Sequence, residues 1–60
     1  MRVWLKEIRE SKNLDKRKVA LLSGISESYY DKIERGERNV PVKTAKKIAD
    51  ALGFDWNLFF

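Results

Sequence analysis

The sequence predicts an all-α fold, a single domain over residues 1–60 built from five short helices. Apolar residues recur three or four positions apart along most of the chain, which is the period of an amphipathic helix. No segment shows the strict apolar–polar alternation of a strand, and glycines or helix-capping residues separate the helical segments. Such short connections predict helices that pack around one shared core.

The first two helices have boundaries that can be read directly from the sequence. The first is expected over residues 3–12, and Asn13 suits the left-handed backbone that often follows a helix. Asp15 is expected to cap the second helix, because its carboxylate can accept a hydrogen bond from a free amide of the first turn. Gly24 is expected to end this helix. The residues expected to face the core from it are Val19, Ala20 and Leu22.

Residues 16–35 form the most informative segment, because they predict two helices joined by a very short turn. Gly24 occupies the turn, where a positive φ is easiest without a Cβ, and Ser26 caps the third helix. Ala20, four positions before this glycine, is small enough for the helices to touch. Helices joined in this way cross at roughly 90–120°. The apolar residues expected to flank the joint are Val19, Ile25, Tyr30 and Ile33. The spacing predicts a helix-turn-helix.

After Gly36 ends the third helix, two further helices are expected. Pro41 suits the first positions of a fourth helix, which Gly53 ends, and Asp55 caps a short fifth helix over residues 56–59. The apolar side of the fourth helix is expected to be Val42, Ala45, Ile48, Ala49 and Leu52. Phe54 and Trp56 are expected to cover the core. An exposed apolar cluster usually marks an interface, so a dimer patch is predicted at Leu58, Phe59 and Phe60.

The composition argues against catalysis and against a bound cofactor. The chain has no Cys and no His, which removes disulfides, thiolate metal sites and the most common general base. The remaining carboxylates, Ser, Lys and Tyr form no convergent catalytic set. We therefore expect no enzyme activity, no metal, no cofactor and no small-molecule ligand. Neither a secretion signal nor a membrane-spanning segment is visible, so a cytoplasmic protein without a membrane partner is expected.

The charge suggests a polyanionic partner. Thirteen Lys and Arg against nine Asp and Glu give a formal net charge of +4, which suits nucleic acid but also an ordinary solvated surface. Lys16, Arg17 and Lys18 cluster at a predicted helix N-terminus, where the helix dipole disfavours cations. A DNA phosphate would relieve this conflict. Alternatively, these cations are solvated and Asp15 compensates them.

Four segments make the chain resemble the XRE family of helix-turn-helix regulators, which includes Cro and lambda repressor. The segments are LKEIRE at residues 5–10, VALLSGIS at 19–26, IERGER at 33–38 and KIADALG at 47–53. The resemblance implies five helices, the third of which, at about residues 27–35, reads the major groove. It also implies a sequence-specific transcriptional regulator, expected to be a repressor, that binds a two-fold symmetric operator in double-stranded DNA as a homodimer.

The resemblance assigns roles to individual positions. Residues expected at base edges or in the groove are Ser26, Glu27, Ser28, Tyr29 and Lys32. Residues expected at DNA phosphates, partly from the basic cluster described above, are Lys16, Arg17, Arg38 and Asn39. Lys16 departs from the family, which usually has Gln at this position. Arg9 and Glu34 match a structural salt bridge between the first and third helices.

The roles of three residues stay open. Glu27 could accept a hydrogen bond from a cytosine amino group, or it could simply favour the N-terminus of its own helix. Tyr29 is expected on the outer side of the third helix, with or without a DNA contact. Asp31 is expected to face solvent or a neighbouring Lys or Arg. The alternative function is an antitoxin-like protein or a protein-interaction module on the same fold.

Overall fold

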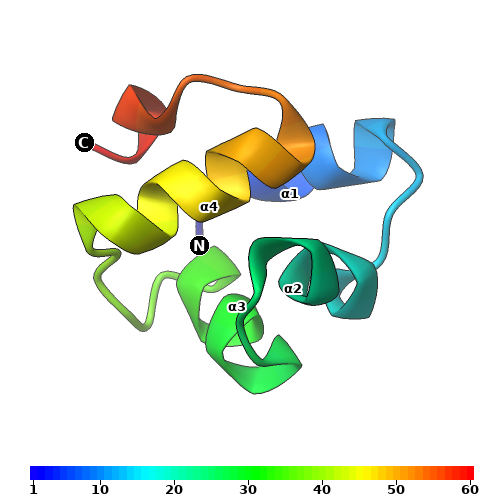
Figure 1. Ribbon diagram of the computed structural model, residues 1–60, viewed down its shortest axis with the longest axis horizontal. Helices are drawn as coiled ribbons and strands as arrows, with labels where there is room; N and C mark the ends of the chain where they lie inside the picture. The colour runs from blue at the N-terminus through cyan, green and yellow to red at the C-terminus, as the bar shows by residue number, and fades with distance from the viewer.

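The computed structural model describes residues 1–60 and contains four α-helices and one 3-10 helix (Figure 1). The elements are α1 (Val3–Ser11), α2 (Lys16–Ser23), α3 (Glu27–Glu34), α4 (Val42–Leu52) and η1 (Trp56–Phe59). The all-α prediction is confirmed, and the expected fifth helix is the 3-10 helix η1. Figure 1 shows α2 and α3 together below α4, with η1 above it. None of these helices is long and apolar enough to cross a lipid bilayer.

The helices begin and end close to the positions that the capping residues predict. The Asp15 carboxylate accepts a hydrogen bond from the Lys18 amide at 2.8 Å, which caps α2. Gly24 follows α2 with φ of 71°, and Asn13 adopts a φ of 57° after α1. These positive φ values are accessible to glycine and, more rarely, to asparagine. Pro41 stands directly before α4 as its cap residue rather than inside its first turn.

The core lies between the four α-helices and is almost entirely apolar. Its buried residues are Leu5, Val19, Ala20, Tyr30, Ile33, Val40, Ala45, Ile48 and Leu52. Two residues predicted to face this core do not: Leu22 is 52% exposed and Val42 is 46% exposed. On α2, the buried side includes Ser23 instead of Leu22, because Val19, Ala20 and Ser23 share one side of the helix and Leu22 lies beside it. Val40, from the loop before α4, is buried and Val42 is not.

Aromatic residues from α1 and the C-terminal segment form a second apolar layer against the core. Phe59 packs edge-on against Trp4 with ring centroids 5.0 Å apart, and Phe54 packs against Trp4 at 5.5 Å. The three residues of the predicted dimer patch differ in their exposure. Phe59 is half-buried within its own chain, whereas Leu58 and Phe60 are 56% and 68% exposed.

Candidate nucleic-acid interface

The joint between α2 and α3 has the geometry of a helix-turn-helix. The Ile25 amide donates to the Ala20 carbonyl at 3.0 Å, so the chain turns sharply as soon as α2 ends. Ala20 is only 2% exposed, and Val19 and Tyr30 are fully buried beside it. Ser26 then starts α3, because its hydroxyl oxygen accepts a hydrogen bond from the Tyr29 amide at 3.1 Å. The apolar side of α3 is therefore held in the core, while its other side faces outward.

The outward side of α3 carries most of the residues that we expected in a DNA groove. Ser26, Glu27 and Ser28 are exposed at the helix N-terminus. Lys32, one turn further along, is half-buried. Tyr29 was expected on the outer side, but it is half-buried and packs against the core. Glu27 forms no ion pair, so its position at the start of α3 is compatible with both of its interpretations.

Lys16, predicted to contact phosphate, already has a partner within the chain. Its ammonium group donates a hydrogen bond to Asp31 Oδ1 at 2.5 Å, which joins the start of α2 to the middle of α3. This hydrogen bond, together with the charges of Lys16 and Arg35, lowers the pKa of Asp31 below its ordinary value. The expectation that Asp31 faces an adjacent cation is confirmed. Arg17, by contrast, is exposed and forms no ion pair.

The loop after α3 presents Arg38 and Asn39, both exposed, near the C-terminal end of that helix. Arg2 holds this loop in place: its Nη1 donates to the Ile33 carbonyl at 2.5 Å and to the Arg38 carbonyl at 3.2 Å. Its backbone amide also donates to the Glu34 carbonyl at 2.8 Å. Arg2 is not among the residues that the sequence singles out. Its partners lie more than thirty residues away, and no local pattern links them.

Arg9 and Glu34, the pair expected between the first and third helices, lie behind this surface. Two hydrogen bonds join them, Nε to Oε2 at 2.9 Å and Nη2 to Oε1 at 3.0 Å. Hydrogen bonding to Glu34 raises the pKa of Arg9, although burial opposes this effect. Burial alone would raise the pKa of Glu34. The hydrogen bonds and the charge of Arg9 act in the opposite direction and prevail, so the pKa of Glu34 lies below its ordinary value. The pair therefore stays ionised, and it orients α3 from the inside.

The arrangement presents exposed polar and cationic side chains that suit a polyanion. No cluster of three or more Asp, Glu, His or Cys side chains is present. Exposed cations are present on α2, at Arg17, and on the loop after α3, at Arg38. Hydrogen-bonding side chains on an exposed helix end, together with nearby elements that carry cations, are features of surfaces that bind duplex DNA.

Comparisons with known proteins agree with this geometry. A family model described as helix-turn-helix matches residues 5–59. Over 60 residues the chain is 45% identical to the HTH-type transcriptional regulator YqaF of Bacillus subtilis, covering all of this chain and 79% of that protein. It is 41% identical over 46 residues to the HTH-type transcriptional regulator y4dJ of Sinorhizobium fredii, covering 77% of this chain and 60% of that relative.

A solved structure is also similar. The crystal structure of the restriction-modification controller protein C.AhdI from Aeromonas hydrophila superposes with a TM-score of 0.86 and 39% sequence identity. The match covers 93% of this chain and 85% of that one.

Proposed function

This chain belongs to the helix-turn-helix family of XRE-type transcriptional regulators, and from that premise we propose that it is a sequence-specific repressor that reads the major groove with α3. The proposal accounts for α3 with one side in the core and a polar N-terminal turn outside. A major groove about 12 Å wide admits one α-helix, and the first residues of such a helix reach the base edges.

The observation that carries the proposal is the exposed N-terminal turn of α3. Ser28 is exposed there and can donate to or accept from a base edge or a phosphate. Glu27 can accept from a cytosine amino group. Lys32 and Tyr29 lie further along and contribute their exposed portions to the groove. Ser26 contributes to groove binding indirectly, because it caps the N-terminal end of α3 that enters the groove.

Phosphate contacts position this turn. Arg17 is exposed at the start of α2, and Arg38 and Asn39 are exposed on the loop after α3. In the sequence, Arg17 precedes the residues proposed to read the groove, and Arg38 and Asn39 follow them. Lys16 contributes to the same contacts once it exchanges its internal partner for a phosphate. Contacts of this kind supply affinity for DNA of any sequence, whereas the base contacts supply discrimination.

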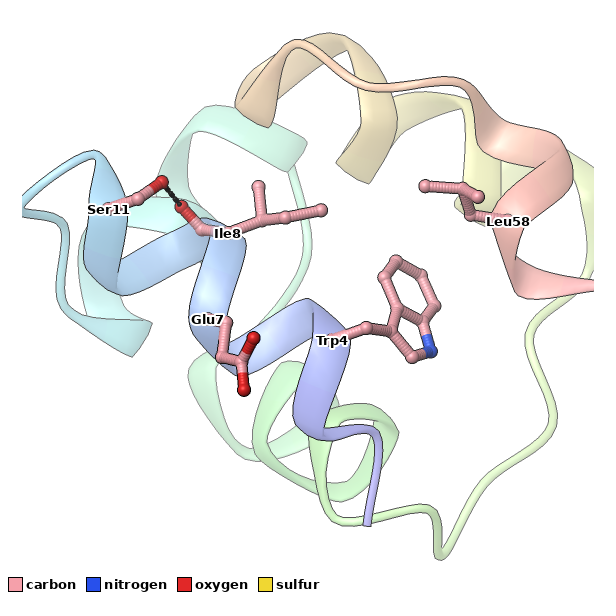
Figure 2. A pocket seen from close by; sticks show the side chains of 5 residues that line it. All are labelled: Trp4, Glu7, Ile8, Ser11 and Leu58. Atoms are coloured by element: carbon pink, nitrogen blue, oxygen red, sulfur yellow. Dashed lines mark hydrogen bonds between the residues drawn. The ribbon is translucent and has the colours of Figure 1, made fainter.

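A homodimer on a two-fold symmetric operator is part of the proposal. Figure 2 shows a shallow apolar groove in which Trp4 and Ile8 of α1 point toward Leu58 of η1. Leu58, which lines this groove, and Phe60, two residues further along the chain, leave more than half of their surface exposed. Apolar surface of this kind usually marks an interface. In Figure 1, η1 lies on the opposite side of α4 from α2 and α3, so a partner bound at η1 leaves α3 accessible.

Selection of binding sites from a random pool of DNA duplexes tests this function. A two-fold symmetric site, with half-site centres roughly 34 Å apart, would support the repressor dimer. Reporter expression with that site between promoter and gene would then fall when the protein is present. The proposal fails if the folded protein retards no duplex at low salt, where phosphate contacts are strongest.

One observation favours a second candidate, a protein-interaction module on the same fold. Leu21 is 71% exposed and Leu22 is 52% exposed on α2. They line a shallow groove with Lys47, Asp50 and Ala51 of α4. A partner protein could cover these leucines. The test is a double variant, Leu21→Ser with Leu22→Ser. This candidate would be favoured if the variant binds DNA normally but no longer represses the reporter or no longer neutralises a toxin partner.

A further inference from the structure

A chain of ion pairs crosses the helix-turn-helix on the surface proposed for DNA. Lys16 on α2 bonds to Asp31 on α3, and Asp31 Oδ2 lies 3.5 Å from Nη1 of Arg35. Arg35 in turn pairs with Glu37 in the following loop, with Nη2 2.6 Å from Oε2. Asp31 is therefore the central anion, between Lys16 of α2 and Arg35, the residue that follows α3.

The pairing divides the cations proposed to contact phosphate into two groups. Arg17 and Arg38 are exposed and have no ion pair, so they can bind phosphate at once. Lys16 has its charge neutralised by Asp31 in the isolated protein. A phosphate can bind the Lys16 ammonium fully only by replacing that carboxylate.

The Lys16–Asp31 pair is suited to such an exchange. The two side chains are 36% and 28% exposed, so water reaches the pair and weakens it. Exposed or partly exposed ion pairs contribute little to stability. Cations near duplex DNA gain in addition from the release of counterions, which makes phosphate a strong competitor. DNA binding by Lys16 is therefore possible, but it is weakened by the pair that must break.

We propose that Asp31 is a positioning residue that limits DNA affinity: it holds Lys16 across the joint and competes with a backbone phosphate for its ammonium group. This inference rests on the proposed function, because it requires DNA at this surface. It assigns Asp31, an acid on α3 that is not among the residues predicted to reach base edges, a role in setting how tightly the protein binds.

The test is a double-mutant cycle between Asp31→Asn and Lys16→Ala, read as duplex affinity by fluorescence anisotropy. The probes are the duplex selected from the random pool and a scrambled duplex of equal length. Asparagine keeps the size of Asp31 and removes its charge. We expect Asp31→Asn to tighten binding to the selected duplex by about two- to fivefold, the range that corresponds to loss of a partly exposed pair. In the Lys16→Ala background this gain should fall to the part that comes from net charge alone.

Asp50→Asn is the matched control, because it makes the same change of charge on α4, where Asp50 is exposed and forms no ion pair. This variant measures the gain in duplex affinity that comes from the change in net charge alone. Thermal melts followed by circular dichroism show that each variant is folded. The Asp31→Asn gain should exceed the Asp50→Asn gain on the selected duplex.

Three results would overturn the inference while leaving the proposed function intact. The gain could equal that of Asp50→Asn, it could be the same with and without Lys16, or Asp31→Asn could weaken binding. In each case the wild-type protein still binds the selected duplex. If the folded wild-type protein binds no duplex at low salt, the proposed function itself fails.

Discussion

Arg9 of α1 and Glu34 of α3 form a two-fold hydrogen-bonded ion pair, with donor–acceptor distances of 2.9 and 3.0 Å, whose side chains are 9% and 1% exposed. Arg9 also donates from Nη1 to the Leu14 carbonyl at 2.9 Å, so the same guanidinium reaches the connection before α2. One side chain thereby joins α1, the connection that leads into α2 and the end of α3. The orientation of α3 depends on this pair.

Arg9→Ala should destabilise the fold severely, because it leaves the Glu34 carboxylate buried without a partner. Breaking a buried ion pair from one side removes about 3–5 kcal/mol, much of the stability of a domain this small. Urea denaturation followed by circular dichroism measures the loss. Glu10→Ala, at an exposed position of α1, is the control and should change the unfolding free energy by less than about 0.5 kcal/mol. Equal effects of the two changes would contradict the role of the pair.

Stability should fall in acid because of Glu34. Its pKa in the folded protein lies below the ordinary value of 4.5, so the unfolded chain binds a proton at higher pH than the folded one. The stability that ionised Glu34 contributes to the fold is present above pH 4.5, and it is lost as the pH falls through the lower pKa of the folded state. An NMR titration of the Glu34 carboxyl checks the shift directly. A midpoint at or above 4.5 would refute it.

Asp15→Ala should remove the N-terminal cap of α2, because the Lys18 amide then loses its acceptor. Loss of such a cap costs about 1 kcal/mol. Asp15→Asn keeps an acceptor oxygen and should retain most of the stability, which separates the hydrogen bond from the charge. Thermal unfolding of the two variants side by side is the measurement, and indistinguishable melting temperatures would argue against capping.

Tyr30→Phe should be neutral or slightly stabilising. The Tyr30 hydroxyl is buried and has no hydrogen-bond partner of good geometry, although it lies near the charged Arg9–Glu34 pair. Burial raises the pKa of this hydroxyl, which keeps it neutral. Removing an unsatisfied buried polar group recovers up to about 1 kcal/mol. A loss of more than that in urea denaturation would indicate that the hydroxyl bonds to Glu34 after all.

Arg17→Ala and Ser28→Ala should affect DNA binding in different ways. Arg17→Ala removes one phosphate contact, so affinity should fall for every sequence and the salt slope should decrease by about 0.9. Ser28→Ala should leave the slope unchanged and alter the preferred bases in a repeated selection. If both variants change only the slope, the N-terminal turn of α3 does not read bases.

Local rules account for most of what could be predicted about the fold. Asp15, Gly24 and Ser26 act on backbone groups within a few residues, so their effects on helix ends follow from the sequence alone. The apolar spacing of Tyr30 and Ile33 likewise determines which side of α3 is buried. These features together predict the helix-turn-helix and the outward N-terminal turn.

The tertiary structure decided which side chains meet across helices. Ser23 rather than Leu22 is buried, because burial depends on how α2 rotates against its neighbours, which local spacing leaves open. Lys16 meets Asp31, fifteen residues away, and Arg2 reaches the Arg38 carbonyl across thirty-six. Such contacts depend on the packing angles of whole helices. The sequence by itself therefore determined the helices, their ends and the family, while packing decided which cations are already paired and which are available for DNA.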